Sequence, residues 1–176
     1  MKVLDTFSLE GKAALVTGGA GLYGRQIVAA LAEAGADTYI AARHLEPLEA
    51  LAKEHRDRGE TVTALRVDQG DPASVLALRD ELMHLAGRID VLVNNAVSRP
   101  MSRGWDDDPA RFDDSMHVNA TGLFVMTRTI GDVMIRQESG SIINIGSMMG
   151  MVGVESANYA GTEMHGFYPD YFFHKG

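Results

Sequence analysis

Short apolar runs alternate with longer helix-patterned segments along most of this chain, and this alternation limits the folds open to it. The runs have the length and apolar content of buried strands, and we expect strands at Ala13–Gly19, Thr38–Arg43, Thr61–Asp68, Ile89–Ala96 and Ser141–Ser147. The segments between them predict helices at Tyr23–Gly35, Leu45–Gly59, Asp71–Gly87 and about Ala110–Gln137. Because each connection must cover one face of the sheet, we predict an α/β fold with a doubly wound parallel sheet between two helix layers.

Composition narrows the class of protein. The 176 residues and an apolar fraction of 45% suit one folded domain spanning residues 1–176. A formal charge of -8 disfavours nonspecific binding to nucleic acid or anionic lipid, because such binding needs a basic surface. The chain has no cysteine, no signal-peptide core at its start and no apolar run near the roughly 20 residues that span a bilayer. We therefore expect a cytoplasmic protein without membrane, nucleic-acid or metal partners.

A glycine-rich string, TGGAGLYG, occupies the turn between the first strand and the first helix. Glycines at this turn let the backbone approach a pyrophosphate, whose charge the free N–H groups of the helix N-terminus bind. The string would also suit a tight turn with no ligand. Its place at the head of a series of strand–helix units favours dinucleotide binding. The candidate residues are Gly18, Gly21, Leu22, Tyr23 and Gly24.

Tyr171 and Lys175 form a second candidate site near the C-terminus. Residues four apart lie on the same face of a helix. A phenol can donate the proton that a carbonyl oxygen needs when its carbon accepts hydride, and a neighbouring ammonium lowers a phenol's pKa, which eases proton exchange at neutral pH. The pair therefore predicts an acid/base site, with Pro169 and Asp170 at the start of its helix.

Tyr159 is the alternative acid/base, since it lies twelve residues after Ser147. Glu163 stands four residues beyond Tyr159, and a carboxylate there would raise a phenol's pKa. We therefore choose Tyr171 over Tyr159. This choice makes Gly153–Asp170 an enlarged loop between the serine strand and the tyrosine helix, and loops are where insertions are best tolerated.

The chain resembles the short-chain dehydrogenase/reductase family, and especially its single-domain dehydrogenases, from about Phe7 to Gly176. The landmarks are the glycine string, NNA at Asn94–Ala96, Asn119 within HVNATG, Ser147 after SIINIG, and the YxxxK pair. The string departs from the family's usual TGxxxGxG, because Leu22 replaces the middle glycine and Gly21 lies one position earlier. The resemblance implies a Rossmann-like sheet of strand order 3-2-1-4-5 that lacks the family's last strands, so the domain would be incomplete at its C-terminus.

The same resemblance implies an oxidoreductase that transfers hydride between NAD(P) and an alcohol or ketone substrate. Tyr171 would be the acid/base, Lys175 would also bond the nicotinamide ribose, and Ser147 would hydrogen-bond the substrate oxygen. Asn119 would hold a water that links the lysine to solvent. On residue chemistry alone, Asn119 could equally be a buried amide bonded to backbone, and Ser147 an ordinary strand-end serine. The family's pairing of subunits implies a homo-oligomer.

Arg43 at the end of the second strand bears on the choice of cofactor. NAD-binding relatives usually place an acid there for the adenosine ribose, whereas an arginine resembles the family's solution for the 2′-phosphate of NADP. NADP is thus the expected cofactor and NAD the alternative. Arg43 could also be an ordinary solvated arginine at a strand end. Asp68 resembles the acid that accepts from the adenine amino group, although it also suits a turn. Asn95 and Ala96, with Tyr171 and Lys175, complete the expected cofactor-binding set.

Four alternatives remain open. Trp105 suits either a substrate pocket or packing, and Met148, Met149 and Met151 suit either an adaptable pocket or the core. A catalytically silent dinucleotide-binding or interaction module is the alternative function, because a helix of about two turns would hold Tyr171 and Lys175 weakly. An epimerase rests on the glycine spacing alone.

Overall fold

The structure is a computed structural model that describes residues 3–162 and 168–176. Backbone contacts divide the chain into two compact units. The sheet unit comprises Met1–Ala96 and Gly122–Asn144, and the loop unit comprises Val97–Thr121 and Ile145–Gly176. A single domain over residues 1–176 stays a prediction.

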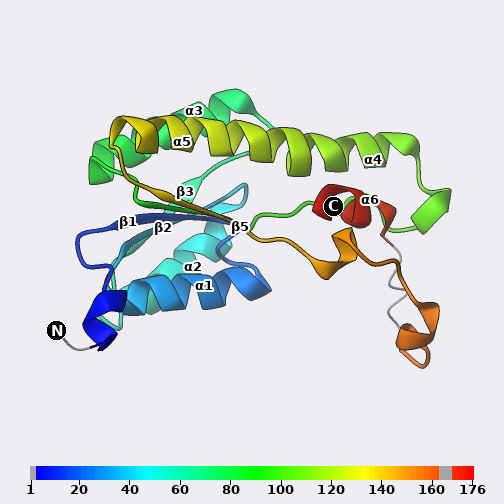
Figure 1. Cartoon of the computed structure of the whole chain (residues 1–176), viewed down its shortest axis with the longest axis horizontal. Coiled ribbons are helices and arrows are strands. Elements are labelled where there is room, and N and C mark those ends of the chain that lie inside the picture. The colour runs from blue at the N-terminus through cyan, green and yellow to red at the C-terminus, as the bar shows by residue number, and fades with distance from the viewer. Residues whose placement is uncertain (1–2, 163–167) are drawn as a thin grey trace. The chain divides into compact units, whose positions relative to one another are not determined.

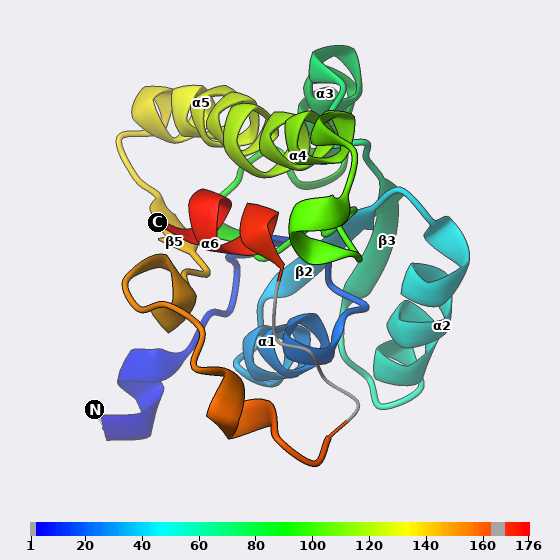
Figure 2. The same ribbon diagram turned by 90° about the vertical axis from the view of Figure 1, so that its right-hand side faces the viewer.

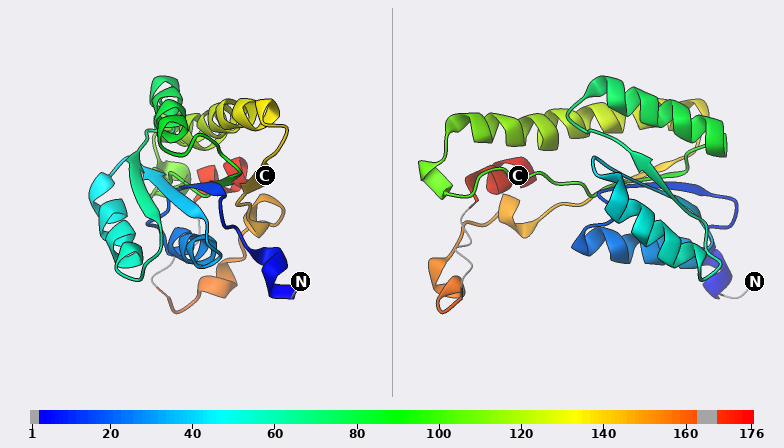
Figure 3. Two further views of the ribbon diagram at one scale, coloured as in Figure 1. Left: turned by 90° about the vertical axis from the view of Figure 1, so that its left-hand side faces the viewer. Right: turned by 180° about the vertical axis from the view of Figure 1, so that it is seen from behind.

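The sheet unit holds a five-stranded parallel sheet of order β3-β2-β1-β4-β5, which confirms the predicted fold and strand order. The strands are β1 (Ala13–Thr17), β2 (Asp37–Ala42), β3 (Val62–Arg66), β4 (Val91–Asn94) and β5 (Ser141–Asn144). One face is covered by α1 (Leu22–Glu33) and α2 (Leu45–Arg56), the other by α3 (Pro72–Ala86) and α5 (Leu123–Arg136) (Figures 1 and 3). The 3-10 turn η1 (Val3–Phe7) precedes β1.

The central strands are buried on both faces, which explains why they read as nearly continuous apolar runs. All of β1 is buried, and Leu15, Ile40 and Leu92 are fully enclosed. On the α3 and α5 side, the core is completed by Leu78 and Met126. The strand β5 pairs with β4 at the edge of the sheet, and its four residues are exposed.

Two helices begin as the sequence predicts. The Asp71 side chain accepts a hydrogen bond from the Ala73 N–H ahead of α3, and Pro72 occupies the first turn. Asp108 makes the same contact with the Ala110 N–H ahead of α4 (Pro109–Met116). Both caps satisfy N–H groups that a helix start leaves unpaired.

The predicted helix over Ala110–Gln137 is wrong in one respect. A π-helical turn, η3 (His117–Gly122), separates α4 from α5. At the end of this turn a Cβ on Gly122 would lie 2.4 Å from the Gln69 carbonyl oxygen, so only glycine fits. The apolar periodicity hides the turn, because one wide turn barely shifts the pattern. The predicted strand Ser141–Ser147 is also too long, since β5 ends at Asn144.

The loop unit contains α4, α6 (Pro169–Lys175) and three short 3-10 turns. These turns are η2 (Gly104–Asp106), η4 (Met148–Gly150) and η5 (Ser156–Tyr159). Pro169 starts α6 as predicted, and η5 lies within the predicted enlarged loop, whereas η4 precedes that loop. The Phe112 and Phe173 rings meet edge-to-face at 5.2 Å. This contact packs α4 against α6, and the two helices lie near each other in Figure 2. No helix in residues 3–162 and 168–176 is long and apolar enough to cross a membrane.

Candidate active site

In the sheet unit, the turn between β1 and α1 requires glycine at two positions. Gly18 has a φ of 68°, and a Cβ there would lie 2.9 Å from the Ala96 Cα. A Cβ on Gly24 would lie 2.3 Å from the Gly18 carbonyl oxygen. The Gly21 N–H closes the turn by donating to that same oxygen at 3.0 Å. The backbone is therefore compact here, as a phosphate-binding turn needs to be.

The first turn of α1 has no side-chain cap. Its N-cap is Gly21, which makes no side-chain hydrogen bond, and Leu22 and Tyr23 are 91% and 77% exposed. Uncapped N–H groups at a helix start attract an anion. Because the Leu22 side chain lies in solvent, it does not occupy space inside the turn. The departure from the family's glycine spacing therefore leaves the turn intact.

Thr17 and Asn95 hold the glycine turn in place. The buried Thr17 hydroxyl accepts from the N–H groups of Asn95 and Ala96, both at 3.1 Å, and lies 3.4 Å from the Val93 carbonyl oxygen. The Asn95 amide donates to the carbonyl oxygens of Thr17 and Gly18, both at 3.0 Å. The side chain of Asn95 thus positions the turn. Sequence reasoning missed Thr17, whose signal was a hydroxyl that ends an otherwise apolar buried strand.

Arg43 and Asp68, the residues expected to contact the adenosine part of the cofactor, differ in their surroundings. Arg43 directly follows β2, is exposed, and makes no ion pair within the described ranges. Asp68 accepts from the Gly70 N–H at 3.0 Å, while its own N–H donates to the Ser74 hydroxyl at 2.9 Å. Asp68 therefore does serve the turn that leads to α3, and its adenine contact stays a prediction.

In the loop unit, α6 carries Tyr171 and Lys175 on one side. The Lys175 ammonium nitrogen lies 6.0 Å from the centroid of the Tyr171 ring. The same nitrogen donates to the Ile145 carbonyl oxygen at 2.5 Å, two residues before Ser147. One hydrogen bond thus joins the lysine of α6 to the segment that carries the serine.

A second contact fixes that segment against α6. The Ser147 hydroxyl accepts from the Met149 N–H at 3.1 Å and caps η4. Gly150, which ends η4, lies so close to α6 that a Cβ on it would be 2.0 Å from the Lys175 carbonyl oxygen. The structure therefore brings together the segment of Ser147, Tyr171 and Lys175. The Ser147 hydroxyl keeps its hydrogen for donation, because this cap uses the oxygen as an acceptor.

Asn119 lies within the π-helical turn and is 6% exposed. Its amide oxygen accepts from the Ser98 N–H at 2.8 Å, and its amide nitrogen donates to the carbonyl oxygens of Ser98 and Ser115 at 2.6 and 2.9 Å. The side chain is a buried amide bonded to backbone, the plainer of the two readings. A water relay at Asn119 stays a prediction. Because the side chain is already hydrogen-bonded to backbone groups, the Asn119 backbone would have to bind that water.

His174 extends this network to α6, which no sequence pattern indicated. The Asn119 amide nitrogen also donates to the Ser115 hydroxyl at 3.1 Å, and that hydroxyl lies 3.3 Å from the His174 Nδ1. Burial lowers the pKa of His174, and the charge of Lys175 lowers it further, while Asp170 opposes both. A neutral imidazole therefore connects α4 to α6, one residue before Lys175.

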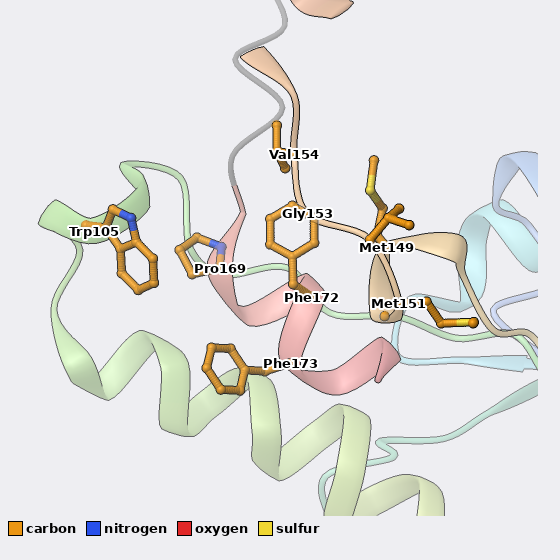
Figure 4. Close-up of a pocket in the computed structure, with 10 residues that line it drawn as sticks. Trp105, Met149, Met151, Gly153, Val154, Pro169, Phe172 and Phe173 are labelled. Atoms are coloured by element: carbon orange, nitrogen blue, oxygen red, sulfur yellow. The ribbon is translucent and has the colours of Figure 1, made fainter.

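An apolar cavity of about 590 Å³ lies within the loop unit. Figure 4 shows Trp105, Pro169, Phe172 and Met149 around it, and Met151 also lines it. Trp105 is 75% exposed, so the pocket reading fits it better than the packing reading. The core reading of the methionines is wrong for Met148 and Met151, which are 70% and 91% exposed.

Tyr159 ends η5, whereas Glu163 lies outside the described residues, so the argument against Tyr159 stays a prediction. Within the described part of the chain, no group of three or more His, Cys, Asp or Glu side chains is placed to hold a metal ion.

The doubly wound parallel sheet of order β3-β2-β1-β4-β5, with a glycine turn between β1 and α1, defines a Rossmann-like α/β fold. The profile of the short chain dehydrogenase family matches residues 12–163. The chain therefore belongs to the short-chain dehydrogenase/reductase family, as its motifs predict.

Three similar proteins illustrate the relationship. A 2-dehydro-3-deoxy-D-gluconate 5-dehydrogenase from Dickeya dadantii (strain 3937) is 34% identical over 152 residues, which is 86% of this chain and 59% of the relative. A gluconate 5-dehydrogenase from Burkholderia cenocepacia J2315, solved with NADP and tartrate, superposes with a TM-score of 0.85 at 31% identity, covering 99% of this chain and 64% of that one. An NAD+-bound xylitol dehydrogenase gives a TM-score of 0.82 at 27% identity, covering 96% of this chain and 61% of that one. The chain thus spans about three fifths of the length of these relatives.

Proposed function

We propose that this chain carries the cofactor-binding and proton-transfer residues of an NAD(P)-dependent oxidoreductase that interconverts an alcohol and a ketone. The observation that carries the proposal is the placement of Lys175 beside the Tyr171 ring, with the Ser147 segment bound to the same helix. The relatives support it, because their names describe dehydrogenases. Assembly into a homo-oligomer belongs to the same proposal and rests on the family resemblance alone.

The proposed chemistry assigns one task to each residue. The nicotinamide, when bound, supplies or accepts the hydride. Tyr171 gives a proton to the carbonyl oxygen during reduction and takes it back during oxidation. Ser147 donates its hydroxyl hydrogen to the same oxygen and so stabilises the charge that develops there. Lys175 uses one of its three donors on the Ile145 carbonyl oxygen, which leaves two for the nicotinamide ribose and the phenol.

The glycine turn, the uncapped α1 and Asn95 are the residues proposed to hold the cofactor pyrophosphate. Arg43 is proposed to bind the 2′-phosphate of NADP, because a guanidinium fork matches a phosphate and Arg43 has no competing ion pair among the described residues. Some similar structures contain NADP and another contains NAD+, so the choice rests on Arg43.

Arg43→Leu tests the cofactor assignment. We expect NADPH affinity, followed by nucleotide fluorescence, to fall about 10- to 100-fold, since hydrogen bonds to charged groups contribute roughly 1.5–3 kcal/mol. NADH affinity should stay within about twofold of the wild type. Arg136→Leu is the control, because Arg136 is an exposed arginine at the end of α5. Its affinities for NADPH and NADH should also stay within about twofold of the wild type. An equal loss for the two nucleotides would contradict the assignment.

Tyr171→Phe tests the proton-transfer assignment. Loss of a general acid should lower carbonyl reduction, followed by NADPH absorbance over a panel of ketones, by about 10²- to 10⁴-fold. NADPH binding should fall far less than carbonyl reduction, because the glycine turn and Arg43, which are proposed to hold the pyrophosphate and the 2′-phosphate, are unchanged. Tyr159→Phe is the matched control and should retain activity. If that variant is the inactive one, Tyr159 is the acid. If the wild type binds NADPH without reducing any ketone, the silent-module alternative is correct.

A further inference from the structure

Arg99 places a second cation beside Tyr171. Its guanidinium carbon lies 5.8 Å from the centroid of the Tyr171 ring and 5.8 Å from that of Tyr168. The Lys175 ammonium lies 6.0 Å from the Tyr171 ring as well. Arg99 is exposed, so a molecule in solution can reach it. Two positive groups therefore flank the ring of the proposed acid/base.

No carboxylate neutralises this pair within the described residues. Lys175 is bonded to a backbone oxygen, and Arg99 makes ring contacts but neither hydrogen bonds nor ion pairs in the described ranges. By contrast, Arg103 in the same segment lies 3.6 Å from an Asp107 carboxylate oxygen. Contact with an aromatic face engages the charge of a guanidinium but consumes none of its five N–H donors.

Asp170 and His174 are the titratable neighbours of this pair among the described residues of α6. The Asp170 side chain is fully buried, and neither of its carboxylate oxygens has a hydrogen-bond partner among the described residues. His174 adds no charge of its own at neutral pH, because burial, Lys175 and Arg99 lower its pKa and outweigh Asp170. By formal charge, Arg99 and Lys175 outnumber the one carboxylate of Asp170, whereas the whole chain carries a formal charge of -8.

We propose that Arg99 binds a carboxylate of the substrate, so that the enzyme acts on oxo acids or hydroxy acids of small size. This inference rests on the proposed function, because it takes Tyr171 as the group that exchanges the proton. A guanidinium offers the planar fork that matches a carboxylate, and its position at the ring lets a short acid reach both groups. Arg99 would then determine specificity, while Tyr171 and Ser147 act on the carbonyl oxygen.

The test compares oxo acids with their neutral esters. Acetoacetate and levulinate are each paired with the corresponding methyl ester, and kcat and KM are measured with NADPH for the wild type and Arg99→Gln. We expect Arg99→Gln to lower kcat/KM for the acids about 10- to 100-fold, mainly through KM, and to change the values for the esters less than about twofold. For the acids, kcat/KM of Arg99→Lys should lie between the values of the wild type and Arg99→Gln, because an ammonium keeps the positive charge but lacks the planar fork of a guanidinium.

Arg111→Gln is the matched control, since Arg111 is an exposed arginine on α4 and the change removes the same charge. It should leave all four substrates unaffected. An equal loss for acids and esters in Arg99→Gln would overturn the inference, because Arg99 would then serve only to hold the segment. A wild type that does not prefer acids to esters would overturn it too.

Binding of malonate, measured by calorimetry, separates this inference from the proposed function. We expect wild-type protein to bind malonate and Arg99→Gln to bind it at least about tenfold more weakly. If no carbonyl is reduced but malonate binding depends on Arg99, the proposed function fails and the carboxylate site stands. If the wild type does not bind malonate and no acid is turned over, the inference is overturned.

Discussion

Asp90 is a buried acid that joins the start of β1 to the start of β4. Arg88 donates to both of its carboxylate oxygens, at 2.5 and 2.7 Å, the Ala13 N–H donates at 3.0 Å, and Lys12 lies at 3.3 Å. Burial raises the pKa of Asp90, but the hydrogen bonds from Arg88, Ala13 and Lys12 outweigh burial and bring the pKa to about 2. Folding therefore favours the ionised form.

Asp90→Asn should destabilise the protein in a pH-dependent way. Because the folded-state pKa is depressed, the contribution of the carboxylate is complete above the ordinary pKa near 4 and is lost as the pH falls through about 2. We expect a loss of about 2 kcal/mol in the free energy of unfolding at pH 7, a value discounted because Arg88 and Lys12 are nearly half exposed. Urea unfolding from pH 7 to pH 2 measures it.

The control for this change is Asp57→Asn, which removes an exposed ion pair with Lys53 and should cost no more than about 0.5 kcal/mol. A difference between Asp90→Asn and wild type that stays constant down to pH 2 would show that the mutation acts through packing and not through the charge.

The backbone of η4 at Gly150 packs directly against the backbone of α6 at Lys175. Gly150→Ala places a Cβ 2.0 Å from the Lys175 carbonyl oxygen, and neither backbone segment can give way without moving Ser147 or Lys175. Overpacking of this kind costs typically about 1–3 kcal/mol, and we expect ketone reduction to fall by about 10- to 100-fold. NADPH affinity should fall less than ketone reduction, because, of the proposed cofactor contacts, only that of Lys175 lies at this contact. Steady-state kinetics and fluorescence titration measure the two effects.

Gly153→Ala is the matched control in the same loop, because its Cβ would meet nothing within 4 Å. It should keep wild-type turnover. If Gly150→Ala is as active as Gly153→Ala, the packing of η4 on α6 is not needed to place Ser147.

At the level of elements, the sequence predicts whatever depends on periodicity and on local capping. Apolar runs locate the five strands, and the Asp71–Pro72 and Asp108–Pro109 pairs start their helices where expected. The π-helical turn and the early end of β5 escape prediction. Both depend on contacts between segments distant in sequence, such as Gly122 against the Gln69 backbone, and no local pattern encodes those contacts.

The candidate site divides in the same way. Tyr171, Lys175 and Ser147 can be proposed from spacing and resemblance, because the chemistry needs those residue types. The Thr17 clamp, the Ser115–His174 contact and the approach of Arg99 to Tyr171 could not be predicted, since each depends on which loops meet in three dimensions. His174 is an example: the sequence shows only a histidine next to the lysine, and its role becomes visible from its contact with Ser115 in the structure.

For the molecule as a whole, we expect the edge of the sheet to be the surface through which copies of the chain associate. The strand β5 pairs only with β4 in the described structure, so the other side of its backbone offers unpaired N–H and C=O groups. Its side chains are apolar and accessible, with Ile142 37% and Ile143 45% exposed. Exposed apolar edge strands recruit further strands, and a charged side chain on such an edge opposes that pairing.

Ile143→Lys should therefore reduce self-association of this chain. We expect light scattering coupled to size exclusion to show concentration-dependent growth above 19.0 kDa for the wild type and a mass near 19.0 kDa for Ile143→Lys. Leu76→Lys is the control, because Leu76 is similarly exposed at 44% but lies on the helix α3 and not on an edge strand. If both lysine variants reduce association equally, the added charge acts through general repulsion. If neither reduces it, the edge of β5 is not the surface through which copies of the chain meet.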